Sequence, residues 1–182
     1  SDNGGGDFAV TVTPVADGPV TLDVASSVAT DTAGNANNAA TQFTIENDET
    51  PPTVTISTSS SDPVSGAFSV DIDFSEDVTG LALGDIVVGN GAASALTGSG
   101  DSYSATITPA ADGTVTVDVG AGAASDDAGN GNTAATQFSI ESDSTMPAVV
   151  ISTVSSDPVS GTFIVTILFD EAVTGFTSGE VV

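Results

Sequence analysis

The chain has 182 residues, of which 25 are Asp or Glu and none is Lys, Arg or His, so its formal net charge is −25. Without cationic side chains it has nothing to neutralise phosphate groups, which argues against nucleic acid and against anionic membrane surfaces as partners. The absence of His, Cys and Lys also removes Ser–His, Cys–His and Schiff-base chemistry, so we expect no enzyme.

Apolar residues make up 39% of the chain, and they alternate regularly with polar ones, which indicates a folded protein despite the high charge. Aromatic residues account for only 5%. A core built mainly from Val, Ile, Ala and Phe suits small β-sandwiches better than one large globule.

Long stretches of the sequence recur with a constant offset of 95 residues: Asp17 recurs as Asp112, and Asp62 as Asp157. This period matches an immunoglobulin-type sandwich of about 100 residues and is too long for a solenoid repeat. The phase of the repeat predicts three parts. Residues 1–49 form the C-terminal half of one module, 50–144 a complete module, and 145–182 the N-terminal half of a third.

Within the complete module, short alternating runs bounded by Gly, Asp, Asn or Pro indicate strands. In chain order we predict seven, at residues 53–58, 67–74, 83–89, 93–97, 102–108, 114–119 and 134–141. Turn residues separate them at 62–66, 98–101, 111–113 and 126–130. The predicted fold is therefore all-β, a tandem array of immunoglobulin-like, seven-stranded β-sandwiches.

Neither half module has enough strands to bury a core of its own. We therefore expect the protein to extend beyond both ends, or each half to be completed by strand exchange with a neighbouring chain.

Three motifs occur together: "FSEDVTG" at 74–80, "TPAADGTVTV" at 108–117 and "DDAGN" at 126–130. With them, the chain resembles the bacterial immunoglobulin-like repeats of very large surface adhesins and biofilm proteins. The resemblance covers essentially the whole sequence. It implies head-to-tail stacking of modules, an extracellular or cell-surface location, and calcium at many module junctions.

The acidic residues themselves also point to calcium. In such a sandwich, the loops after the second and sixth strands lie beside the linker from the preceding module, so their carboxylates converge on the linker. Ca²⁺ takes six to eight oxygen ligands in flexible geometry, whereas Zn²⁺ and Cu²⁺ favour His or Cys. The predicted ligands at the first junction are Asp17, Glu46, Asp48, Glu76, Asp77 and Asp126, and those at the second are Asp112, Glu141, Asp143 and Glu171.

An alternative reading is that these acids are turn residues and solubilising charges, since Asp is common in turns. For the whole protein, we expect a calcium-rigidified spacer in a head-to-tail array of neighbouring modules. The alternative is a building block of an extracellular filament or surface layer, formed by lateral self-association or strand exchange.

Overall fold

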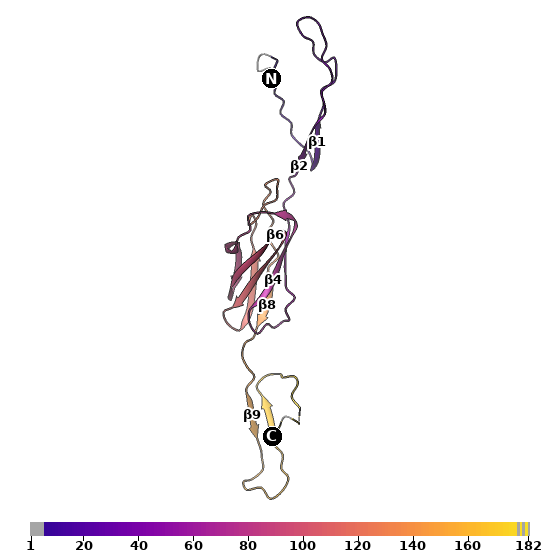
Figure 1. Cartoon of the computed structure of the whole chain (residues 1–182). Coiled ribbons are helices and arrows are strands. Elements are labelled where there is room, and N and C mark those ends of the chain that lie inside the picture. The colour runs from indigo at the N-terminus through magenta and orange to yellow at the C-terminus, as the bar shows by residue number, and fades with distance from the viewer. Residues whose placement is uncertain (1–5, 178, 180, 182) are drawn as a thin grey trace.

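A computed structural model describes residues 6–177, 179 and 181 of the chain. Figure 1 shows an elongated molecule of three parts. The first contains a hairpin of β1 (Gly18–Leu22) and β2 (Phe43–Asn47), the last a hairpin of β9 (Val149–Ser152) and β10 (Thr166–Phe169), and a β-sandwich lies between them.

The sandwich consists of two three-stranded antiparallel sheets. One sheet has the order β3-β4-β6, and the other the order β5-β7-β8. Their bounds are β3 Val54–Ser57, β4 Phe68–Val78, β5 Ile86–Gly89, β6 Gly91–Pro109, β7 Gly113–Val119 and β8 Phe138–Ser142, with a single 3-10 turn, η1, at Leu83–Asp85. The predicted all-β fold is thus confirmed.

The predicted fourth and fifth strands are both contained in β6, which doubles back on itself. The Thr97 hydroxyl donates to the Ser104 carbonyl at 3.4 Å, and the Ser94 hydroxyl to the Thr106 carbonyl at 3.4 Å. Gly98 makes this return, with a φ of 112°, and a Cβ there would lie 2.6 Å from Tyr103 Cα. The hairpin turn predicted at 98–101 therefore depends on glycine.

Strand boundaries differ from the prediction at two places. β4 continues to Val78, beyond the predicted end at residue 74, and its pairing with β6 shifts register between Asp73 and Val78. Glu76 consequently lies in an irregular part of a strand, whereas the sequence suggested a loop. The last strand of the module begins at Phe138 rather than at residue 134, because residues 134–137 cross between the sheets outside any ladder.

The core lies between the two sheets and follows the predicted alternation. On β4, for example, every second residue from Phe68 to Phe74 is buried, as are Val115, Val117 and Val119 on β7. Tyr103 closes one side by packing edge-on against Phe74, with ring centroids 5.9 Å apart, and its hydroxyl donates to the Val78 carbonyl at 3.1 Å. No buried side-chain polar atom in the described residues lacks a hydrogen bond.

The terminal hairpins keep the strand registers of the sandwich, displaced by one repeat. Val20 faces Ile45 in β1–β2 as Val115 faces Ile140 in β7–β8. On the other side, β9–β10 repeats every pair of β3–β4 in the same way. The division into a half, a complete and a second half module stays a prediction, and these registers are consistent with it.

Candidate metal centre

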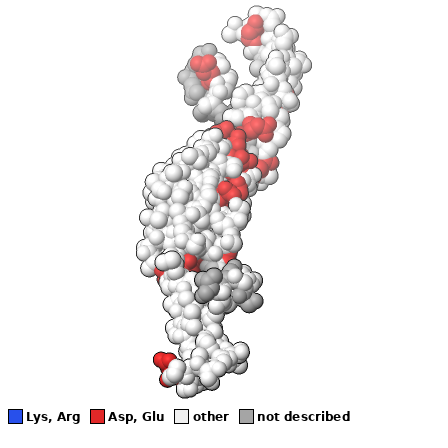
Figure 2. Space-filling model, turned by 60° about the horizontal axis from the view of Figure 1, so that its bottom comes forward, with Lys and Arg blue, Asp and Glu red and all other residues white. Residues whose placement is uncertain are grey.

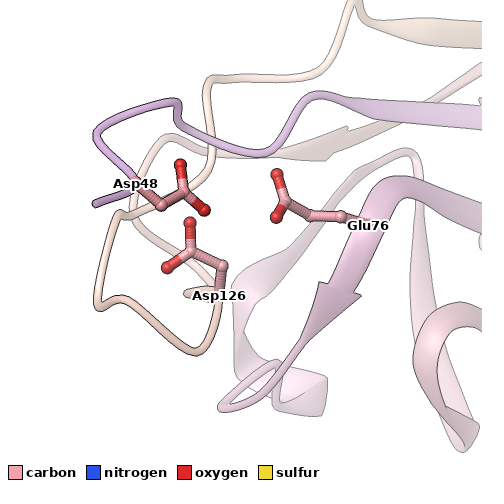
Figure 3. A group of neighbouring side chains, drawn as sticks. All are labelled: Asp48, Glu76 and Asp126. Atoms are coloured by element: carbon pink, nitrogen blue, oxygen red, sulfur yellow. The ribbon is translucent and has the colours of Figure 1, made fainter. Parts of the chain in front are cut away.

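Three carboxylates meet at the end of the sandwich where the chain enters from β2. Asp48 lies in the linker between β2 and β3, Glu76 in the irregular end of β4, and Asp126 in the loop between β7 and β8. One carboxylate oxygen of each lies within 4.8 Å of those of the other two, and all three side chains point toward one another (Figure 3). Figure 2 shows acidic side chains gathered where the β1–β2 hairpin joins the sandwich.

Backbone hydrogen bonds join the three segments that carry these acids. Thr79, at the end of β4, and Ser125, beside Asp126, exchange two backbone bonds of 2.8 and 2.9 Å. The linker is tied to β4 by the Ser75 amide, which donates to the Thr53 carbonyl at 2.9 Å, and by the Thr53 amide, which donates to the Ser75 hydroxyl at 3.0 Å. The carboxylates are therefore held close by the fold itself, without any cation in the chain to draw them together.

Asp126 is the buried member of the group, with 6% of its surface exposed. Burial acts to raise the pKa of Asp126, but hydrogen bonds outweigh it and leave the pKa below its ordinary value. Those bonds come mainly from Asn130, whose side-chain amide donates to one carboxylate oxygen at 2.9 Å and whose backbone amide donates to the other at 2.8 Å. Asp126 is thus held in the charged form, which is the form that binds a cation.

Glu76 responds in the opposite direction. Its pKa is raised above the ordinary value, first by desolvation and then by the negative charges of Asp48 and Asp126. A like charge at close range disfavours ionisation. The raised pKa shows that three carboxylates at this site repel one another, and that a positive charge placed among them would relieve the repulsion.

The donor set of the site consists of oxygen atoms alone. Oxygen-only sites suit Ca²⁺ or Mg²⁺, whereas soft metals favour imidazole or thiolate ligands. Three carboxylates on separate segments allow the flexible, higher coordination that Ca²⁺ accepts. Asp48, Glu76 and Asp126 could therefore hold a divalent cation and, by doing so, fasten the linker to the sandwich.

The other acids predicted at this junction lie outside the three-carboxylate group. Asp17 instead fastens the linker: its carboxylate accepts hydrogen bonds from the Glu49 amide at 2.8 Å and from the Thr50 hydroxyl, which lower its pKa. Glu46 is exposed and lies on β1–β2, opposite Pro19. Asp77 follows Glu76 in β4 and lies on the side of Gly100, away from the group.

At the second junction, the predicted acids form no three-carboxylate group among the residues that the structure describes. Asp112 accepts bonds from the Thr145 hydroxyl and from the hydroxyl and amide of Ser144, and these lower its pKa to about 2. Asp143 accepts from the Thr145 amide at 3.1 Å, and Glu141 from the Thr114 hydroxyl at 2.6 Å. Glu171 is exposed.

The repeat explains this difference between the junctions. One period after Asp48 and Glu76 stand Asp143 and Glu171, but one period after Asp126 falls past Val182. One period before Asp126 stands Asp31, which accepts the same two bonds from Asn35, each of 2.8 Å, that Asp126 accepts from Asn130. Each acid of the group thus has a counterpart, and the described part of the chain brings one full set together.

Asn130 is a residue of the site that the sequence interpretation treated only as part of a turn. Besides holding Asp126, its side-chain amide donates to the Asp48 carbonyl at 3.1 Å and so links the loop to the linker. The available signal was the recurrence of an Asp with an Asn four residues later, at Asp31–Asn35 and Asp126–Asn130.

Comparison with known families matches residues 48–141 to a family described as the bacterial Ig-like domain. This match spans more than half of the chain and coincides with the two-sheet sandwich and its acidic end. The chain belongs to the bacterial Ig-like domain family. The predicted resemblance and the immunoglobulin-like fold class are thereby confirmed. No curated protein and no solved structure matches the chain significantly.

Membership of this family favours a structural repeat over an enzyme, and bacterial Ig-like domains occur in surface proteins. Across residues 6–177, 179 and 181, no helix has the length and apolar character needed to cross a bilayer.

Proposed function

We propose that this bacterial Ig-like chain is a spacer of an extracellular bacterial adhesin, made of sandwiches that stack head to tail and are stiffened by Ca²⁺ at their junctions. The observation that carries the proposal is the convergence of Asp48, Glu76 and Asp126, because one of these acids belongs to the linker and two to the sandwich. An ion bound among them would connect one module to the next.

The linker is already tied to both of its neighbours by hydrogen bonds. Asp17 binds it from the side of β1–β2, and Asn130 binds it from the side of the sandwich. These contacts are few and exposed to solvent, so each contributes little to rigidity. A divalent cation at the three carboxylates would add a stronger connection and remove their mutual repulsion, which makes the stiffness of the junction depend on calcium.

The proposal is tested by thermal unfolding and small-angle scattering, each in Ca²⁺ and in EGTA. At a Ca²⁺ concentration 100 times Kd, binding stabilises the sandwich by about 2.7 kcal/mol, which raises the melting temperature by about 10–20 °C. The longest dimension of the molecule should also be more sharply defined with Ca²⁺.

The matched variants are Asp126→Asn, which should lose the calcium response, and Asp71→Asn, which should keep it. Asp71 lies on the solvent face of β4, away from the group. An equal melting temperature in Ca²⁺ and EGTA for the unmodified chain would refute the calcium part of the proposal.

A filament is the second candidate function, favoured by the exposed apolar residues on both terminal hairpins. Leu22 and Phe43 are exposed on β1–β2, and Val149 and Leu168 on β9–β10. Electron microscopy of the purified chain separates the two functions, because a spacer gives isolated thin particles and a filament gives ordered fibres.

A further inference from the structure

The two terminal parts of the chain carry between them the equivalent of one complete sandwich core. Each of the fifteen residues in the core of the central sandwich has an apolar counterpart one repeat period away. Seven counterparts lie in the segment 7–47, the N-terminal segment, and eight in the segment 149–181, the C-terminal segment. They are Val10, Val12, Val20, Leu22, Val24, Ala29 and Ile45, and Val149, Val159, Phe163, Val165, Ile167, Phe169, Val173 and Val181.

None of these fifteen counterparts is buried. Phe68 is 6% exposed in the sandwich, whereas its counterpart Phe163 is 48% exposed. Ala105 is 1% exposed, whereas its counterpart Val10 is 71% exposed. Apolar side chains placed together on one face and left in water favour association, because covering them releases their hydration water.

Both segments are already shaped as the halves of a sandwich, because their hairpins have the registers of β7–β8 and β3–β4. The pairing that is absent is the one between β4 and the second half of β6. There Phe68 faces Ile107 and Val70 faces Ala105. Displaced by one period, the same register places Phe163 opposite Val12 and Val165 opposite Val10.

Within one molecule these two segments lie at opposite ends, with the sandwich between them (Figure 1). We propose that the N-terminal segment of a second copy closes the C-terminal segment into a complete sandwich, so that copies join head to tail. Each junction leaves one segment open at either end, and such a heterologous contact continues as a linear polymer. The inference rests on the second candidate function above and is independent of calcium.

The acidity of the chain sets the conditions for this association. Two copies that each carry −25 charges repel at low ionic strength, and the repulsion is screened within about 3 Å at an ionic strength near 1 M. We expect association to strengthen as salt increases, and this dependence distinguishes an apolar junction from one held by ion pairs.

The first experiment compares two neighbouring substitutions on β9 by sedimentation velocity in high salt with EGTA. Val149 is the counterpart of the core residue Val54, and Val150 is the counterpart of the solvent-facing Thr55. We expect the unmodified chain and Val150→Asp to form multimers whose mass grows with concentration, and Val149→Asp to remain monomeric. A monomeric unmodified chain, or equal loss of multimers in both variants, would overturn the proposal.

The second experiment tests the register with disulfides, since the chain has no cysteine. Ser69 faces Thr106 in the sandwich, so the proposed junction places Ile164 opposite Thr11 of the next copy. Directly opposed residues lie about 4.5–5.5 Å apart, within disulfide reach. The double variant Thr11→Cys and Ile164→Cys should oxidise to a ladder of covalent multimers on a non-reducing gel.

The control pairs Thr11→Cys with Thr162→Cys, which is two residues out of register and should give a much weaker ladder. Equal ladders from both pairs, or dimers from Thr11→Cys alone, would contradict the proposed junction. Because association is measured in EGTA, its failure leaves the calcium-dependent melting test untouched, and a chain that ignores calcium can still form multimers.

Discussion

Two neighbouring carboxylates of the candidate centre are tuned in opposite directions, and the reason lies in their partners. Asp126 is buried, yet its pKa is lowered because Asn130 donates two hydrogen bonds to its carboxylate. Glu76 has no hydrogen-bond donor of this kind, and desolvation and its negative neighbours raise its pKa. In the absence of a cation, Glu76 is therefore the member of the group that most readily takes up a proton.

This difference predicts a change of sign for Glu76→Gln. In EGTA at neutral pH the variant should be more stable than the unmodified chain, because it removes a charge that repels Asp48 and Asp126. In Ca²⁺ it should be less stable, because it removes a ligand.

The pH dependence follows from the raised pKa of Glu76, which lies above its ordinary 4.5 in the fold. The ionised group costs stability at neutral pH, and this cost disappears as the pH falls through the raised pKa. The difference between the two proteins in EGTA should therefore shrink in acid. Melting curves from pH 7 to pH 4 measure it, and a variant less stable than the unmodified chain in EGTA at pH 7 would contradict the repulsion.

Among the structural elements, the loop between β7 and β8 positions the centre although it contains no strand or helix. Asn132 organises it from within: its side-chain oxygen accepts from the Ala124 amide at 2.8 Å, and its amide group donates to the carbonyls of Gly120 and Thr133 at 3.0 and 2.7 Å. Asn132 is 2% exposed. A polar side chain buried here replaces the backbone pairing that a regular strand would supply.

Replacing Asn132 by Ala should destabilise the sandwich by about 1–3 kcal/mol, because the buried Ala124 amide loses its acceptor. Urea denaturation measures this loss. The matched control is Asn37→Ala, one repeat period earlier, where the same bonds to Ala29 and Ala25 are made on an exposed hairpin. Asn37→Ala should leave the unfolding transition of the sandwich unchanged, and a loss as large as that of Asn132→Ala would show that the two regions unfold together.

For the whole molecule, folding and exposure are distributed unevenly along the chain. All fifteen core residues lie between Val54 and Ile140, inside the family match at 48–141. The three acids of the centre lie within the same match. The central sandwich thus contains both its own core and its own cation ligands, while the two terminal hairpins expose their apolar faces.

We therefore expect a polypeptide of residues 48–144 to fold without the rest of the chain and to keep its calcium response. Circular dichroism and amide exchange test the folding, and calorimetric titration with Ca²⁺ tests the site. A polypeptide of residues 1–47 should show no cooperative transition, because it has one pair of strands and no second sheet to cover it. An unfolded 48–144 polypeptide would show that the sandwich depends on its neighbours.

The sequence by itself determined the features that depend on local pattern. The alternation at Phe68–Phe74 and Val115–Val119 marked the core strands, because a side chain on a strand faces the sheet interior at every second residue. The offset between Asp17 and Asp112 marked the repeat, and the excess of acids at the linker marked the junction. The absence of cationic residues decided which partners are unfavourable.

Only the tertiary structure decided which acids come together. The sequence interpretation grouped Asp77 with Glu76, but the two alternate on one strand and only Glu76 faces Asp48 and Asp126. The extension of β4 to Val78 and the hydrogen bonds of Asn130 also depend on contacts between segments far apart in the chain. Local pattern carries no information on such contacts, because they arise only when the two sheets close over their common core.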